Sequence, residues 1–274
     1  DLEVTARGLS EVPKEQRGQI SAERRGLHDA ANIRTFFLNY GMVGDYPSNP
    51  GEADLSTFHS AEVPKGSGMN YSDGVTPFVL AKIVDVNGIT RYPMLTGYRE
   101  RQEENPLTAR QMRFEPRPGY FERNPRVNLA NSPAISTDPR TWPSHWPDKL
   151  DDPSDPGWPG SWNGYFGKRA AADQESFTVM DDDAYVALEY LPDSRDPTRR
   201  GLGLRVEVRG FQWANPQAGN VIFWHYDITN ESTTDQDSII FGLYMDSGVG
   251  GSEWSCDQAF ESDDDNAFWD RSAQ

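Results

Sequence analysis

Three consecutive stretches decide the fold: GLGLRVEVRGFQWA (residues 201–214), GNVIFWHYDITNES (219–232) and SIIFGLYMDSGVG (238–250). In the first, Leu204, Val206 and Val208 alternate with charged residues, and a period of two is that of a β-strand. Short segments containing Asn, Pro, Gly or Asp separate the stretches, which favours antiparallel neighbours. We therefore expect three antiparallel strands that lead into an aspartate-rich loop.

The same alternation predicts the surroundings of two of these strands. Arg205, Glu207 and Arg209 share the second face of the first strand, so we expect that face to lie in water. In the second strand, Val221 and Phe223 lie on one face, while the opposite face also carries aromatic and aliphatic residues. We therefore expect a half-buried first strand and a central second strand.

Length and composition agree with one large β domain. The chain has 274 residues, and its 12% aromatic content can fill a β core with large rings and argues against disorder. We predict a mainly β fold, an antiparallel β-sandwich with long irregular loops rich in Pro, Gly and Trp. Residues 1–26 are expected to form a short polar N-terminal arm. One elaborated domain is expected over 27–274, with its sandwich core at about 175–274.

The charge of the chain excludes several partners. Its formal net charge is −17, from 43 acidic and 26 basic residues, which argues against binding to nucleic acid or to anionic membrane surfaces. No apolar run approaches the roughly 20 residues that cross a bilayer. The single cysteine, Cys256, has no partner for an internal disulfide. Such a chain suits a calcium-rich or salty exterior, where cations offset self-repulsion.

A hairpin is predicted in the first half of the chain. FVLAKIVDV (78–86) and ITRYPMLTG (89–97) flank Asn87-Gly88, and an Asn-Gly pair between apolar runs favours a two-residue turn. Because proline cannot donate a backbone hydrogen bond, Pro93 places the second run at a sheet edge.

The loop after the third strand is the first candidate site. Its acidic residues include Asp246, Asp257, Asp263, Asp264 and Asp265, and glycines between them allow backbone carbonyls to turn inward. Calcium takes six to eight oxygen ligands of these kinds. The spacing matches no EF-hand, so the alternatives are a structural calcium site and a solvated acidic loop.

The irregular segment 101–172 supplies the second candidate. Trp142, Trp146, Trp158 and Trp162 lie in it among many Pro and Gly residues. Exposed tryptophan rings form platforms for sugars, which would make these four residues ligand-binding. Alternatively the rings are the core of the loop itself, since such loops commonly fold over their own side chains.

Further polar residues admit both structural and catalytic interpretations. Asp181, Asp182 and Asp183 lie between two apolar runs, where a polar turn is the simpler interpretation. His225 and Asp227 share a strand face and could form a dyad, although a satisfied structural histidine is commoner in β proteins. The chain contains no G-x-S-x-G nucleophile motif, and a carboxylate pair for glycoside hydrolysis stays open.

Longer strings resemble a known group of proteins. They include RRGLGLRVEVRGFQWANPQAGNVIFWHYDITN (199–230), IIFGLYMDSGVGG (239–251), ESDDDNAFWD (261–270), VPKGSGMNYSDG (63–74) and SPAISTDPRTWPSHWPD (132–148). They are similar to large, mostly uncharacterised exported proteins of Bacteroidetes-type bacteria over roughly residues 28–270. Members of that family often carry fibronectin type III modules and a C-terminal sorting domain for type IX secretion.

The resemblance implies an extracellular or cell-surface β-rich protein and strengthens the calcium interpretation of the acidic loop. It brings no catalytic residues. Because this chain stops at Gln274 without such a sorting domain, we expect it to be a fragment of a longer protein.

Two functions follow as hypotheses. The first is a non-enzymatic structural or adhesion module outside the cell, stabilised by calcium, that contacts neighbouring protein subunits or glycan. The alternative is a polysaccharide-binding or polysaccharide-active protein that uses the Trp-rich loop. Neither involves nucleic acid or membrane insertion.

Overall fold

The computed structural model describes residues 2–4, 12–44, 60–72, 74–97, 112–119, 132–143, 146 and 161–247. Strands dominate these residues, and the helical elements there are single 3₁₀ turns: η1 (Lys14–Gln16), η2 (Ile20–Ala22) and η5 (Pro139–Thr141). No helix in this part of the chain is long and apolar enough to cross a membrane. The mainly β, antiparallel prediction is confirmed, while the sandwich arrangement stays a prediction.

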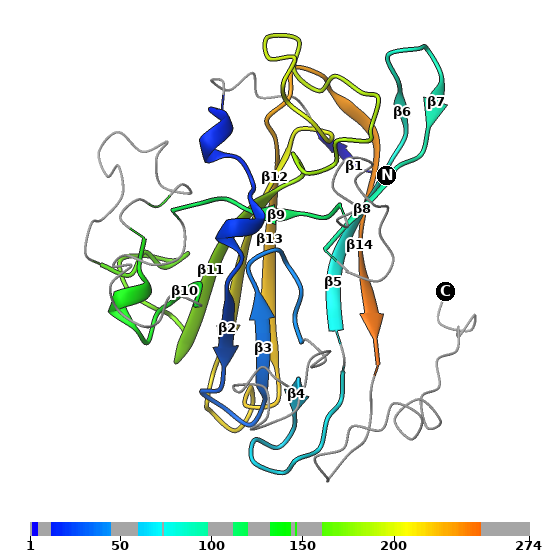
Figure 1. Cartoon of the computed structure of the whole chain (residues 1–274). Coiled ribbons are helices and arrows are strands. Elements are labelled where there is room, and N and C mark those ends of the chain that lie inside the picture. The colour runs from blue at the N-terminus through cyan, green and yellow to red at the C-terminus, as the bar shows by residue number, and fades with distance from the viewer. Residues whose placement is uncertain are drawn as a thin grey trace.

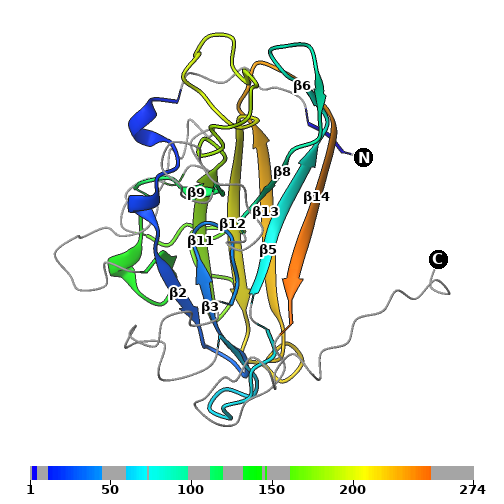
Figure 2. The same cartoon turned by 45° about the vertical axis from the view of Figure 1, so that its right-hand side comes forward.

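Two larger sheets form the body of the molecule (Figures 1 and 2). The first has the order β1 (Leu2–Val4), β14 (Gln236–Asp246), β5 (Gly74–Ala81) and β8 (Met94–Thr96). The second has the order β10 (Ala134–Ile135), β11 (Gln174–Asp181), β12 (Leu204–Gln212) and β13 (Ile222–Asn230), with β9 (Glu115–Pro116) also paired to β11.

Smaller pairings complete the described strands. They are β2 (Arg25–His28), β3 (Arg34–Leu38) and β4 (Ala61–Glu62) in one group, and β6 (Ile83–Val84) with β7 (Thr90–Arg91) in a hairpin. Val43 bridges to Phe37 of β3 and to Val75 of β5, which connects the first group to the first sheet.

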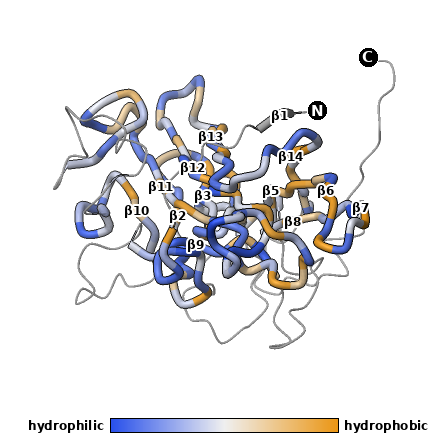
Figure 3. The backbone as a smooth tube through the Cα atoms, turned by 90° about the horizontal axis from the view of Figure 1, so that it is seen from above, coloured by the Kyte–Doolittle hydropathy of each residue, from blue (hydrophilic) through white to orange (hydrophobic). Residues whose placement is uncertain are grey.

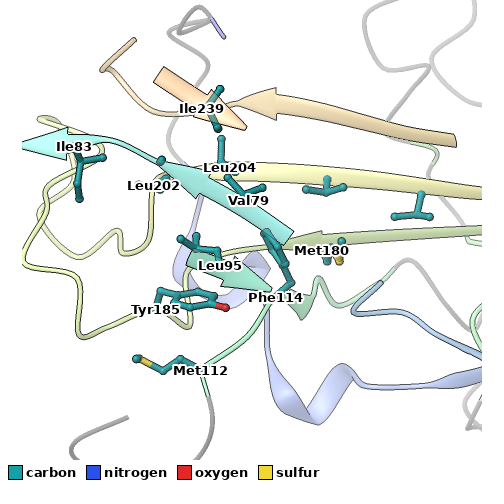
Figure 4. Packing of buried hydrophobic residues seen from close by; sticks show 13 residues of the cluster. Val79, Ile83, Leu95, Met112, Phe114, Met180, Tyr185, Leu202, Leu204 and Ile239 are labelled. Carbon is teal, nitrogen blue, oxygen red and sulfur yellow. The ribbon is translucent and has the colours of Figure 1, made fainter. Parts of the chain in front are cut away.

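The main core lies between the two larger sheets (Figure 4). Val79 of β5 and Leu95 of β8 meet Met180 of β11 and Leu204 of β12, and all four are fully buried. We call the face of the second sheet that enters this core its inner face and the opposite one its outer face. The core therefore contains residues of β5 and β8 as well as residues from 175 onwards, where the core was predicted.

The predicted surroundings of β12 and β13 are wrong and are nearly the reverse of those observed. β12 pairs with both β11 and β13, and its charged residues Glu207 and Arg209 are buried, with 5% and 3% of their surface exposed. β13 pairs in the described part of the chain only with β12, and most of its side chains keep some exposure. The charged face of β12 is buried because its ions are paired and covered: Arg205 binds Glu207 at 3.0 Å, and the Arg209 guanidinium lies 4.5 Å from the Phe177 ring centroid.

The third predicted strand forms, but it does not pair with the second. β14 pairs antiparallel with β5 over Ile239–Asp246 and with β1 at Leu2 and Val4. The chain therefore passes from the second sheet to the first between β13 and β14. Consecutive strands often pair, but here burial of Ile239 against the core favours the other sheet.

The hairpin prediction is confirmed, with a longer turn than expected. β6 pairs with β7 and β5 pairs with β8, and the Asp85 N–H donates to the Ile89 carbonyl across a three-residue loop. Gly88 has φ +79°, the conformation that closes such a loop with little strain in glycine. As Pro93 indicated, β8 pairs only with β5 among the described residues.

Part of the segment expected as a polar arm packs against the fold within its described residues 12–26. Residues 25 and 26 belong to β2, and both Arg17 and Ala22 are 3% exposed. Arg17 is held by Asp196 and Thr198, which come from a loop far along the chain. The polar composition of this segment thus reflects ion pairing in the fold as well as contact with solvent.

Candidate functional site

The residues predicted for calcium lie mostly outside the described part of the chain. Asp257, Asp263, Asp264 and Asp265 are outside it. Asp246 ends β14 with a half-buried side chain, and its backbone carbonyl accepts from the Ser72 hydroxyl at 3.0 Å. Within the described ranges, no three His, Cys, Asp or Glu side chains are grouped to hold a metal ion. The calcium site therefore stays a prediction.

Tryptophan residues predicted to bind sugar form an internal cluster on the outer face of β11. Trp146 and Trp162 are 0% and 3% exposed, with centroids 5.0 Å apart, and Trp146 also packs on Phe177 at 5.3 Å. Trp142 is half-buried against Trp162, and Trp158 lies outside the described ranges. Since buried rings present no face to a ligand, Trp146 and Trp162 do not form a sugar platform here.

A buried carboxylate holds this cluster in place. Glu175 is fully buried and accepts from the Trp162 indole N–H at 2.7 Å. Its other oxygen accepts the backbone N–H groups of Ala171 at 2.6 Å and Ala172 at 3.1 Å. These bonds tie the preceding loop to β11, which explains why the rings pack inward.

The Asp181–Asp183 run is the centre of a buried ionic network and does not form a solvent-exposed turn. Arg117 donates from Nε to Asp181 at 2.8 Å and through both terminal nitrogens to Glu231, at 3.1 and 2.5 Å. Although burial disfavours the charge of Arg117, Asp181 and Glu231 raise its pKa above the ordinary value. The network joins β9, β11 and the end of β13, so its role is structural.

Asp182 organises the chain before β12. It is fully buried and accepts the backbone N–H groups of Leu202 at 2.6 Å and Leu204 at 3.0 Å. Burial outweighs these bonds and the nearby Arg199 charge and raises the pKa of Asp182 to about 7. Gly201 crosses Asp182 so closely, at φ +68°, that an added Cβ would lie 2.3 Å from the Asp182 carbonyl oxygen.

One carboxylate pair is brought together, but without the geometry of a glycosidase. Glu115 is buried, which is the main cause of its raised pKa, and the nearby Glu23 charge raises the pKa further. The two carboxyl groups share Arg113, which ion-pairs with both. Glycosidases separate the pair by about 5 Å or more to admit the sugar, so this pair does not fit.

A set of rings, three of them exposed, lies beside the Trp cluster, on the outer face of the second sheet toward β13. We call it the aromatic face; its members are His225, Tyr165, Phe166, Phe211, Trp213 and Phe223. In this order each ring contacts the next, with centroids 4.8 to 6.4 Å apart. Phe166 is 76% exposed, Phe223 52% and Tyr165 43%. Clusters of exposed rings are uncommon on soluble proteins and commonly mark binding sites.

The fold holds these rings in place. Phe211 is buried and pairs with Phe223 across β12 and β13. The Trp213 indole N–H donates to the Ala171 carbonyl at 3.0 Å. Tyr165 and Phe166 occupy a tight turn in which Gly164 and Gly167 form a β-bridge. The rings are thus preorganised on rigid elements.

Polar groups accompany the rings on the same face. His225 and Asp227 follow Phe223 at every second position of β13, and neither makes a hydrogen bond or ion pair with the described residues. Instead the His225 ring packs on Tyr165 at 4.8 Å. No His225–Asp227 hydrogen bond forms in the described structure, so the dyad that these two residues could have formed is not assembled.

The aromatic face could be predicted only in part from the sequence. Period two places Phe223, His225 and Asp227 together, but the apolar residues on both faces of that strand indicated a central position in a sheet. Tyr165 and Phe166 lie in the irregular segment, where local sequence does not show which rings pack inward. Comparisons with protein-family models, curated proteins and solved structures found no match to this chain.

Proposed function

We propose that this chain is a non-enzymatic binding module that works outside the cell and holds a glycan on its aromatic face. The observation that carries the proposal is the row of rings, three of which are 43% to 76% exposed, beside the His225 imidazole and the Asp227 carboxylate. Neither of these polar groups makes a hydrogen bond or ion pair with the described residues. A sugar offers an apolar C–H face to a ring and hydroxyl groups to polar side chains, and this surface supplies both partners.

The location rests on two separate arguments. The net charge of −17 suits an environment rich in cations, and the resemblance to exported Bacteroidetes-type proteins supports secretion. The rings proposed to bind sugar are therefore Tyr165, Phe166, Trp213 and Phe223, in place of the predicted tryptophans, because these four rings are accessible to a ligand.

Loss of an exposed ring is expected to weaken glycan binding about tenfold. A stacked ring contributes about 0.5–1.5 kcal/mol beyond its buried area, and 1.4 kcal/mol corresponds to a factor of ten. Glycan-array binding of the wild-type chain would identify the ligand, and titration of Phe166→Ala and Phe223→Ala with that ligand would measure the loss. Tyr71→Ala is the matched control, because Tyr71 is 45% exposed and lies outside the aromatic face.

Two outcomes would refute this assignment. If the wild-type chain binds no glycan on the array, the proposed ligand class is wrong. If Phe166→Ala and Phe223→Ala bind as tightly as Tyr71→Ala, the glycan lies elsewhere on the molecule.

Calcium is proposed as a structural ion in the loop that begins at Asp246. A ligand at one hundred times its Kd stabilises the native state by about 2.7 kcal/mol, which raises Tm by roughly 5–10 °C in a chain of this size. We therefore expect EGTA to lower Tm by that amount and calcium to restore it. Replacing Asp263, Asp264 and Asp265 with Asn should abolish the response, whereas Asp237→Asn, on exposed β14 surface, should retain it. An unchanged wild-type Tm in EGTA would remove calcium from the proposal.

A further inference from the structure

A second site lies on the opposite side of the molecule from the Trp cluster, at the β6–β7 hairpin. Viewed from above, this hairpin is at the margin and carries strongly hydrophobic residues (Figure 3). A cavity of about 430 Å³ separates it from residues 185–189. This volume is in the lower part of the range for small-molecule sites, about 300–1,000 Å³.

The walls of the cavity are tied together at two places. At the hairpin tip, the Val86 N–H donates to the Glu189 carbonyl and the Asn87 amide donates to the Glu189 carboxylate, both at 2.8 Å. At the base, the Tyr185 hydroxyl accepts from the Thr96 N–H at 2.6 Å and donates to the Thr96 carbonyl at 3.0 Å. The cavity is therefore preformed, which lowers the entropic cost of binding.

One cation in the cavity wall, Arg91, makes a hydrogen bond with the described residues through only one of its three guanidinium nitrogens. Arg91 donates from Nε to Asp85 at 3.0 Å, while its two terminal nitrogens make no hydrogen bond or ion pair with the described residues. Asp85 is itself fixed, since its other oxygen accepts the N–H groups of Asn87 at 2.9 Å and Ile89 at 2.8 Å. Asp85 thus acts as a positioning residue that leaves the Arg91 fork available for a carboxylate.

The cavity wall also contains an anion, Glu189, and several apolar side chains. Glu189 uses one carboxylate oxygen for Asn87, and the other makes no hydrogen bond or ion pair with the described residues, so it is available for an ammonium group. Ile83, Met94 and Leu188 also line the cavity, together with the 72% exposed ring of Tyr92.

We propose that this cavity binds a zwitterionic apolar amino acid or short apolar peptide with both termini free. Its carboxylate pairs with Arg91, its ammonium pairs with Glu189, and its aliphatic side chain packs on Ile83, Met94 and Leu188. The wall carries one guanidinium, from Arg91, and two carboxylates, from Asp85 and Glu189. A purely anionic ligand would be repelled by these carboxylates, and a purely cationic ligand would leave the terminal nitrogens of Arg91 without an anion. This site is independent of the aromatic face and does not rest on glycan binding.

Calorimetric titration with four ligands tests the proposal. The probes are leucine, Leu-Leu, N-acetyl-Leu-Leu and Leu-Leu amide, and the first two distinguish a single amino acid from a peptide. We expect binding by leucine, Leu-Leu or both, and at least about tenfold weaker binding when either terminus of Leu-Leu is blocked. Arg91→Gln should remove the preference for a free carboxylate, and Glu189→Gln should remove the preference for a free amine.

Lys82→Gln is the matched control, because Lys82 is an exposed cation on the same hairpin that does not line the cavity. It should bind like the wild-type chain. The proposal fails if neither leucine nor Leu-Leu binds at millimolar concentrations. It also fails if the blocked peptides bind as well as the free one, a result that does not depend on whether any variant folds.

Discussion

Arg117→Met is expected to lower the free energy of unfolding by about 3–5 kcal/mol, the usual cost of removing one partner from a buried ion pair. Arg117 is 6% exposed and neutralises Asp181, which is fully buried, and Glu231, which is 7% exposed. Its loss leaves Asp181 with backbone donors, among them the Gly18 N–H at 3.0 Å, but without a guanidinium beside it. Because whole-protein stability is about 5–15 kcal/mol, this change should be readily measured by urea denaturation.

Arg140→Met provides the comparison. Arg140 also pairs with an aspartate, Asp138 at 2.9 Å, but its side chain is 56% exposed, and such surface pairs contribute about 0–1 kcal/mol. Arg117→Lys should fall between the two, since it keeps the charge and loses the fork that spans two carboxylates. If Arg117→Met and Arg140→Met shift the urea midpoint equally, the buried network does not hold β9, β11 and β13 together.

Trp146→Ala is expected to cost about 3–5 kcal/mol, as large-to-small changes at buried aromatic positions do. The ring is fully buried among Trp162, Phe177 and the Arg209 guanidinium, so its removal leaves a cavity beneath the loop. Thermal or urea unfolding would measure the loss. Trp146→Phe should cost less, since a ring remains and the buried indole N–H, which has no hydrogen-bond partner among the described residues, is removed.

Phe166→Ala is the control that separates packing from binding. Phe166 is 76% exposed, so its removal should change stability by less than about 0.5 kcal/mol while weakening glycan binding. The reverse pattern, a stable Trp146→Ala that loses glycan binding, would restore the Trp-rich loop as the sugar platform.

The hairpin shows which features of the fold could be predicted locally. Asn87-Gly88 specifies a tight reversal because the left-handed conformation of Gly88 is a property of that residue alone. Its exact length, three residues instead of two, depends on Asp85, whose carboxylate accepts the Asn87 and Ile89 N–H groups. The site beneath the hairpin could not be predicted, because Glu189 is about one hundred residues away in sequence.

The candidate ligand-binding rings show the limit of composition. Trp-rich and Pro-rich sequence indicated an aromatic loop, and both a platform and an internal core were compatible with it. The internal core forms because Glu175 accepts a hydrogen bond from Trp162 and holds that ring inside the protein, whereas Tyr165 and Phe166 are exposed. No local pattern distinguishes these rings, since their exposure depends on which distant segment covers them.

The sequence by itself determined the secondary structure from Gly201 to Asp246, because side-chain alternation with a period of two is a local property of extended backbone. It also determined the acidic balance and the reversal at Gly88. Only the tertiary structure decided that β12 is central, that β13 is half-exposed and that β14 joins the other sheet. Burial and strand pairing are set by contacts between residues far apart in the chain, such as Arg117 with Glu231, and alternation within one strand contains no information about them.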